Sequence, residues 1–412
     1  MRTTYTVILT ASSLFGLFVT AGAQTRATDY TQWRGQNRDG SASGFVEPKA
    51  WPEKLTLKWK IEIGEGYATP ILVGNRVYEH TRRDGAEVLM ALEADTGKTI
   101  WETKYAAPYK MNPATARHGQ GPKATPLFYE NKLFTLGITG IVSAFDASTG
   151  KVLWQKPAPP VDPLYGTPMS PIADHGLIIV HVGGHNQGAL TAFEANTGAV
   201  KWAWNGDGPS YGSPIVATLG GTRQVITMTQ QYIVGVDAET GALLWQRPWG
   251  TKVANNDITP IIYRDTVIVS GQDRGVTAFK PAKQGTTWNT DTVWETQEVS
   301  MWMSNGVLLG DTLYGLSHRA SGQYFALDAK TGKVLWLGQG RQANNSAVVK
   351  AGDLLFLLND DGQLIVARGN PSGLQPVRQY VVAENATWAQ PAISGNRLFI
   401  KDVSTLALWT IN

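Results

Sequence analysis

Residues 144–154 read AFDASTGKVLW, and four other stretches of the 412-residue chain repeat this pattern of residue types. In every copy a small and an apolar residue precede Asp or Glu, Gly follows four residues after the acid, and Trp follows four residues after Gly. The other copies are residues 91–101, 192–202, 235–245 and 326–336. Self-similarity at a period of about 40–50 residues is typical of a repeat architecture.

One repeat reads as strand, turn and strand. Asp146 can accept hydrogen bonds from backbone N–H groups of the turn, and Gly150 can adopt the positive φ that the reversal requires. Apolar runs with a period of two occupy residues 132–136 and 141–145, upstream of the turn, and a further run opens with Thr or Ser and Pro. Four short antiparallel strands per repeat are the blade of a β-propeller.

The most regular residues of the repeat are expected to have structural roles. Each Trp is predicted to pack between neighbouring blades, since a large ring at a constant strand position suits such a core. The tryptophans in this position are Trp59, Trp101, Trp154, Trp202, Trp245, Trp294 and Trp336. The turn glycines are Gly97, Gly150, Gly198, Gly241 and Gly332.

Eight blades are predicted from the starts of the units. The starts are Thr69-Pro70, Thr125-Pro126, Ser170-Pro171, Ser213-Pro214, Thr259-Pro260, Ser304-Asn305, Ser346-Ala347 and Gln390-Pro391. The last unit lacks a fourth strand, while residues 57–63 form an orphan strand before the first unit, so their pairing would close the ring and remove two exposed edges. We therefore predict an all-β, eight-bladed propeller of four-stranded antiparallel blades, with seven blades as the alternative.

Composition and the N-terminal sequence indicate an exported protein. The formal net charge is +3 and no basic run occurs, so nucleic acid is not expected as a partner. The chain has no Cys, which excludes disulfides, Cys-ligated zinc, covalent c-type haem and thiol catalysis. Residues 1–23 read as a signal peptide with cleavage near Ala23, residues 24–56 as a leader and residues 57–412 as the propeller. We expect a periplasmic or secreted monomer without a membrane span in the mature chain.

Polar and aromatic residues gather in the loops that precede the blade starts, and these loops are predicted to form a binding face. Aromatic rings supply contact area, and amide or charged groups supply directional hydrogen bonds. The candidate residues are Tyr67, Arg117, His118, Tyr165, Tyr211, Asn256, Asp257, Trp302, Asn344, Asn345 and Trp388. The hydroxyls at the blade starts are expected to bind water or neighbouring backbone. No catalytic set and no metal site are predicted, because Asn255-Asn256-Asp257 alone cannot supply the ligands that calcium needs.

The repeat resembles the pyrroloquinoline-quinone (PQQ)-type propeller repeat over nearly all of residues 57–411. That resemblance implies the propeller fold and leaves the function open. The superfamily includes quinone-dependent alcohol and sugar dehydrogenases and the non-catalytic BamB-type scaffold of outer-membrane assembly. This chain lacks the adjacent cysteines that cap the quinone in the former and the lipidated Cys of the latter.

Two hypotheses follow from the sequence. The leading one is a non-catalytic exported propeller, without a cofactor, that binds an envelope protein or another extracytoplasmic partner. The alternative is an atypical PQQ- and calcium-dependent alcohol or sugar dehydrogenase. A weaker third idea is glycan binding by the aromatic loops.

Overall fold

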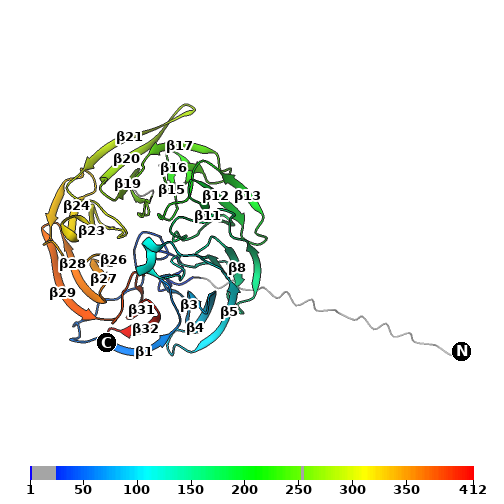
Figure 1. Ribbon diagram of the computed structural model, residues 1–412. Coiled ribbons are helices and arrows are strands. Elements are labelled where there is room, and N and C mark those ends of the chain that lie inside the picture. The colour runs from blue at the N-terminus through cyan, green and yellow to red at the C-terminus, as the bar shows by residue number, and fades with distance from the viewer. Residues whose placement is uncertain (2–24, 252–254) are drawn as a thin grey trace.

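A computed structural model describes residue 1 and residues 25–251 and 255–412. Within these residues, 32 strands form eight four-stranded antiparallel sheets, arranged as blades around a central channel (Figure 1). The predicted all-β, eight-bladed propeller is therefore confirmed, and seven blades are excluded. Apart from residue 1, the predicted signal peptide lies outside the described residues.

The blades are numbered here in chain order, and each innermost strand is the first of its blade. Blade 1 consists of β2 (Ile71–Val73), β3 (Arg76–Arg83), β4 (Ala86–Glu93) and β5 (Thr99–Ala106), and blade 2 of β6 (Leu127–Tyr129), β7 (Lys132–Leu136), β8 (Val142–Asp146) and β9 (Val152–Lys156). Blade 3 consists of β10 (Ile172–Asp174), β11 (Leu177–Gly184), β12 (Gln187–Glu194) and β13 (Val200–Trp204), and blade 4 of β14 (Ile215–Leu219), β15 (Thr222–Met228), β16 (Tyr232–Asp237) and β17 (Leu243–Pro248). Blade 5 consists of β18 (Ile261–Tyr263), β19 (Thr266–Gly271), β20 (Gly275–Gln284) and β21 (Thr287–Thr296). Blade 6 consists of β22 (Val307–Leu309), β23 (Thr312–Ser317), β24 (Gln323–Asp328) and β25 (Val334–Leu337). Blade 7 consists of β26 (Ser346–Ala351), β27 (Leu354–Asn359), β28 (Gln363–Asn370) and β29 (Gly373–Val381). Two short 3₁₀ helices, η1 (Pro113–His118) and η2 (Arg319–Ser321), complete the described elements.

Blade 8 joins the two ends of the propeller. It contains β30 (Ala392–Ser394), β31 (Arg397–Lys401) and β32 (Thr405–Thr410), and β1 (Thr56–Glu62) supplies its outermost strand. β1 pairs with β32 along its length, and the blue and red strands lie side by side in Figure 1. The predicted ring closure is thus confirmed.

The small residue, the Gly and the Trp of the repeat form one contact between blades. In blade 2, Trp154 pairs with Ala144 across a β-bulge, where a larger residue would compete with the ring for space. The indole Nε1 donates to the Ala195 carbonyl oxygen of blade 3 at 3.0 Å. A Cβ on Gly198 of the same turn would lie 2.7 Å from the ring, and its φ of +69° also favours glycine.

The same interblade contact recurs around most of the ring. The other indole N–H donors and the alanine carbonyls that accept from them are Trp59 with Ala94, Trp101 with Ala147, Trp202 with Ala238 and Trp294 with Ala329. Trp245 differs, because the following blade has no acid–Gly turn at this point, and its N–H donates to Gln224 Oε1 at 2.6 Å instead.

Hydroxyls at the blade starts join neighbouring blades around the channel. Most of them accept a hydrogen bond from a backbone N–H of an adjacent blade start. Five consecutive contacts, at 2.9–3.3 Å, run from the N–H of Gln390, Thr69, Thr125, Ser170 and Ser213 to the hydroxyl of Thr69, Thr125, Ser170, Ser213 and Thr259 respectively. The expectation that these hydroxyls bind neighbouring backbone is confirmed for these residues.

The leader crosses one end of the channel and is held there by two buried arginines. Arg34 donates from Nη2 to the Gly306 carbonyl oxygen at 2.8 Å. Arg38 donates to the carbonyl oxygens of Ser170, Pro171 and Pro214 at 2.6–3.0 Å, and 6% of its surface is exposed. Segments of three different blades are thereby tied to one short stretch of the leader.

Candidate functional site

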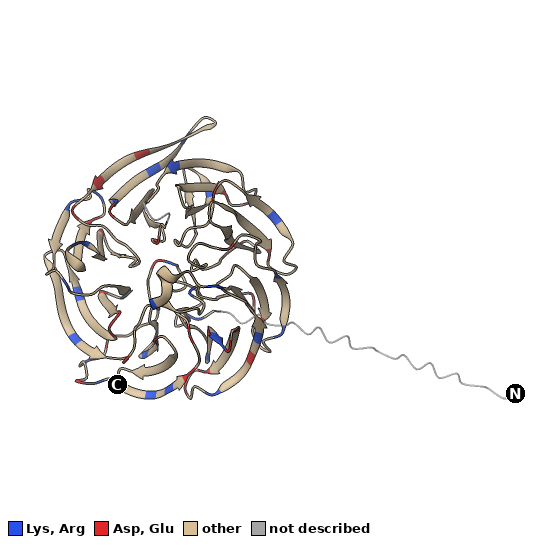
Figure 2. Cartoon of the chain, in the orientation of Figure 1, with Lys and Arg blue, Asp and Glu red and all other residues tan. Residues whose placement is uncertain are grey.

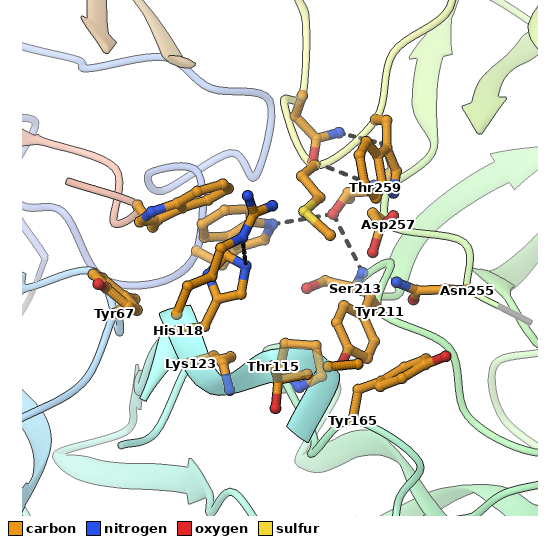
Figure 3. A pocket seen from close by; sticks show the side chains of 18 residues that line it. Tyr67, Thr115, His118, Lys123, Tyr165, Tyr211, Ser213, Asn255, Asp257 and Thr259 are labelled. Atoms are coloured by element: carbon orange, nitrogen blue, oxygen red, sulfur yellow. Dashed lines mark hydrogen bonds between the residues drawn. The ribbon is translucent and has the colours of Figure 1, made fainter. Parts of the chain in front are cut away.

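A cavity of about 320 Å³ lies where the central channel meets the loops that enter the innermost strands (Figure 3). Loops of blades 1 to 6 and 8 contribute to its walls. Eight of the eleven predicted loop residues line it, namely Tyr67, Arg117, His118, Tyr165, Tyr211, Asp257, Trp302 and Trp388. The remaining lining residues are Trp33, Ala114, Thr115, Lys123, Pro168, Ser213, Asn255, Thr259, Met303 and Asn305. The cavity is therefore built from segments spread over most of the chain.

The other three predicted residues do not line the cavity. Asn256 is buried, and its Nδ2 donates to the carbonyl oxygens of Thr229 and Trp249. The backbone N–H groups of Asn344 and Asn345 donate to the Asp360 carboxylate at 3.2 and 3.1 Å. The side-chain amide of Asn256 and the backbone N–H groups of Asn344 and Asn345 therefore fix the conformation of loops. The residue type alone does not reveal whether an Asn has this role or contacts a ligand.

Trp33 and Lys123 are lining residues that the sequence did not single out for a site. Trp33 comes from the leader, and its Nε1 donates to Thr259 Oγ1 at 3.1 Å. The sequence indicated a leader over residues 24–56, but nothing in it placed Trp33 in the wall of a cavity. Lys123 lies in a loop without a motif, between η1 and β6.

One wall of the cavity is basic and aromatic, and the short helix η1 positions it. The Asn112 side chain caps η1 by accepting from the Ala114 N–H, while its Nδ2 donates to the Leu164 carbonyl oxygen of the next loop. This cap orients Arg117 and His118 at the other end of the helix. The Arg117 guanidinium carbon lies 5.5 Å from the Trp388 ring centroid, a cation–π contact.

His118 is held as a neutral acceptor within this wall. Its Nε2 accepts from Arg117 Nε at 3.1 Å, and its ring meets that of Trp388 edge to face at 4.4 Å. Burial, together with the charges of Arg117 and Lys123, lowers the pKa of His118 to about 4. A neutral imidazole bonded to a guanidinium is not arranged as the base of a hydrolytic triad, which needs a nucleophile within hydrogen-bond reach.

The opposite wall carries Asp257 among aromatic rings. Figure 3 shows Asp257, Asn255, Tyr211 and Tyr165 across the cavity from Tyr67, His118 and Lys123. Both Asp257 carboxylate oxygens are buried without a hydrogen-bond partner, as are Trp302 Nε1 and the Tyr211 hydroxyl. Asp257 is the only acidic residue among the described residues that line the cavity.

The loops of blades 4 and 5 fix this acidic wall. The Ser210 hydroxyl donates to the Asn256 carbonyl oxygen at 3.1 Å, and the Asn256 N–H donates to Ser210 Oγ at 2.5 Å. The Tyr211 N–H also donates to that carbonyl oxygen. Tyr211 and Asp257 therefore adjoin the hydrogen bonds that join the two loops, and the Asp257 charge contributes to a raised pKa of Tyr211, after the larger effect of burial.

The opposite charges of the cavity do not neutralise one another. Burial raises the pKa of Asp257 to about 7, partly opposed by the nearby Trp302 and Asn255 side chains. Burial alone lowers the pKa of Lys123 to about 8, and its Nζ has no hydrogen-bond partner. On the outside of the ring, by contrast, basic and acidic residues are interspersed (Figure 2). The cavity thus keeps two opposite charges apart, each without a hydrogen-bond partner.

The donor atoms of the cavity do not fit a calcium-bound quinone. Asn255 Oδ1 and the two Asp257 carboxylate oxygens are buried without hydrogen-bond partners. They supply three oxygen ligands, two of them from one carboxylate. Calcium takes six to eight oxygen ligands. Among residues 25–251 and 255–412, no three His, Asp or Glu side chains gather where they could hold a metal ion. We derive no reaction step from this cofactor.

Replacing Asp257 with Asn is expected to stabilise the protein at alkaline pH. The folded state retains a proton on Asp257 up to about pH 7, whereas the unfolded chain releases it near pH 4. Folding therefore becomes less favourable as the pH rises between these values. The free energy of unfolding of Asp257→Asn should exceed that of the wild type by ~2 kcal/mol at pH 8, with the gap closing by pH 4.5.

Urea unfolding at pH 4.5, 6 and 8 measures this difference. Asp291→Asn, which alters an exposed residue of β21, is the matched control and should show no such trend. Equal stability of Asp257→Asn and the wild type at pH 8 would mean that the Asp257 carboxylate is solvated or paired in the folded protein.

Comparison with known proteins gives relatives over most of this fold. BamB of Shewanella oneidensis, an outer membrane protein assembly factor, is 22% identical over 377 residues, covering 87% of this chain and 78% of the relative. The structure of BamB from Moraxella catarrhalis superposes with a TM-score of 0.62 at 17% identity, covering 86% of this chain and 99% of that one. The structure of the quinohemoprotein alcohol dehydrogenase of Comamonas testosteroni superposes with a TM-score of 0.66 at 14% identity, covering 95% of this chain and 81% of that one. These two structures show the shared propeller fold.

The sequence model of a family described as outer membrane protein assembly factor BamB matches residues 84–338. These residues are more than half of the chain and include most of the described blades. The chain belongs to this family of PQQ-like β-propellers.

Proposed function

We propose that this protein is an exported, non-catalytic binding module whose partner is an envelope protein or another extracytoplasmic component. The observation that carries the proposal is the cavity, because loops of seven blades converge on it with aromatic rings and unpaired polar atoms. Such a concave, largely aromatic site with a few directed polar groups is typical of binding sites. The similarity to BamB supports a partner in outer-membrane assembly.

The comparisons and the helices are compatible with this proposal. In the part of the chain that the structure describes, no helix has the length and apolarity needed to cross a membrane. We propose a periplasmic or secreted location, with removal of residues 1–23 near Ala23. The rim residues Tyr67, Trp302 and Trp388 would contact the partner, and the interblade tryptophans would hold the loops that carry them.

Partner recovery tests the proposed face. The purified wild type and a variant with Tyr67→Ala, Trp302→Ala and Trp388→Ala are immobilised and incubated with extract of the source organism's envelope. Recovery of outer-membrane assembly components, quantified by mass spectrometry, should fall at least fivefold for the variant. A variant with Val152→Ala and Leu153→Ala, two exposed positions of β9, is the control. Equal recovery by wild type and triple variant would discard this face.

The dehydrogenase alternative has one observation in its favour, the buried Asp257 beside Asn255. The incomplete oxygen set for calcium argues against it. Adding PQQ and calcium to the purified protein tests it directly. A bound quinone absorption band with dye-linked oxidation of an alcohol or aldose would support the alternative over the scaffold role.

A further inference from the structure

The cavity separates two opposite charges that the protein leaves unpaired. The Asp257 carboxylate oxygens on one wall and Lys123 Nζ on the other are each buried without a hydrogen-bond partner. Burying an unpaired ionisable group is unfavourable, so a pair of them in one small cavity needs an explanation. A direct Asp257–Lys123 ion pair would remove both penalties, yet no effect of either charge on the other's pKa is found.

Each charged group has surroundings suited to a ligand group of opposite charge. Asp257 lies close to the polar groups of Tyr211 and Trp302, and a buried carboxylate favours an ammonium group as its partner. Lys123 and Arg117 both line the cavity, and both charges are close enough to His118 to lower its pKa. Two basic groups of this kind favour a carboxylate.

The size of the cavity limits the ligand. About 320 Å³ is at the lower end of the range for small-molecule sites, roughly 300–1,000 Å³. It is suited to a molecule of about twenty non-hydrogen atoms or fewer. A small molecule with a positive end and a negative end satisfies both unpaired groups at once.

We propose that the cavity binds a small zwitterion, a free amino acid or short peptide, with its ammonium group at Asp257 and its carboxylate at Lys123 and Arg117. This inference rests on the proposed binding role of the cavity and specifies the chemical class of its ligand. The aromatic rings of Trp33, Tyr165 and Tyr211 would contact the apolar part of the ligand. No covalent step is involved.

Calorimetric titration of the purified protein tests the proposal. The twenty amino acids and a set of dipeptides covering each of them at both positions are used as probes, at pH 7.5. At least one zwitterion should bind, and its N-acetylated and C-amidated forms should each bind at least tenfold more weakly. Failure of every probe to bind, or equal binding of the acetylated form, overturns the proposal.

Variants assign the two ends of the ligand. Asp257→Asn should weaken binding of the zwitterion at least tenfold but leave binding of its N-acetylated form unchanged, because that form has no ammonium group. Lys123→Met should weaken binding of the zwitterion and leave binding of its C-amidated form unchanged, because that form has no carboxylate. Since Asp257→Asn is expected to be more stable than the wild type, a loss of binding cannot be attributed to unfolding. Wild-type affinity in Asp257→Asn would contradict the proposal, and Asp291→Asn is the control.

This experiment and the partner recovery fail independently. If no zwitterion binds but the triple rim variant loses its partner, the binding role stands and the ligand class is wrong. If a zwitterion binds and the rim variant still recovers its partner, the cavity is a small-molecule site and the proposed partner face is discarded.

Discussion

Arg38→Ala should lower the free energy of unfolding by ~4 kcal/mol and release the leader from the channel. The Arg38 guanidinium donates to the carbonyl oxygens of Ser170, Pro171 and Pro214 and to the Gln32 side chain, all within the channel. Its removal leaves three backbone acceptors without this partner, and each buried, unsatisfied group costs about 1–3 kcal/mol. The empty volume left by the side chain adds to the loss.

Guanidinium chloride unfolding measures the stability, and limited proteolysis of residues 25–55 measures release of the leader. Arg38→Lys should recover part of the loss, because one ammonium group can donate to some of the same carbonyl oxygens. Lys201→Ala, which alters an exposed residue of β13, is the control. A leader that remains resistant to protease in Arg38→Ala would show that Tyr30 and Ala42, which also bond to the blades, are sufficient to hold it.

Trp154→Ala should destabilise the protein by about 3–5 kcal/mol, the usual cost of deleting a buried Trp. The Trp154 ring has 9% of its surface exposed and meets the rings of Phe134 and Phe193 at centroid distances of 5.9 and 6.0 Å. Its loss opens a cavity between blades 2 and 3 and leaves the Ala195 carbonyl oxygen without its donor.

Trp336 provides the matched comparison, since it holds the same repeat position but is only half-buried. Trp336→Ala should cost less than half as much as Trp154→Ala in the same urea titration. Equal losses for the two variants would mean that the effect arises within each blade, from the pairing with Ala144 or Ala326, and not from the interface between blades.

The sequence was sufficient to predict the fold because its signals are local and repeated. The small residue opposite Trp154, the turn Gly150 and the Trp itself each meet a requirement that recurs in several blades, so their spacing is visible in the sequence. In the fifth blade, Trp294 was assigned to the repeat position, and it pairs with Ala278 as Trp154 pairs with Ala144. The same regularity indicated the blade starts and hence the closing strand.

The site was less accessible to prediction because its contacts join loops that differ from blade to blade. Lys123 has no neighbouring motif, and its burial appears only in the folded chain. Asn256 was predicted to be a binding residue, but its Nδ2 donates to the carbonyl oxygens of Thr229 and Trp249. Backbone acceptors carry no signature in the sequence, so the partners of Arg38 were equally invisible.

The pairing of β1 with β32 has a consequence for the order in which the chain folds. A ribosome makes residues 56–62 long before residues 405–410, so the eighth blade stays incomplete until the other seven blades have been synthesised. The leader, which needs carbonyl groups from several later blades, cannot settle in the channel before those blades exist. Contacts between such distant residues form slowly. This delay would suit the export that we propose for this protein, because a chain crosses a membrane unfolded and its ring would close afterwards.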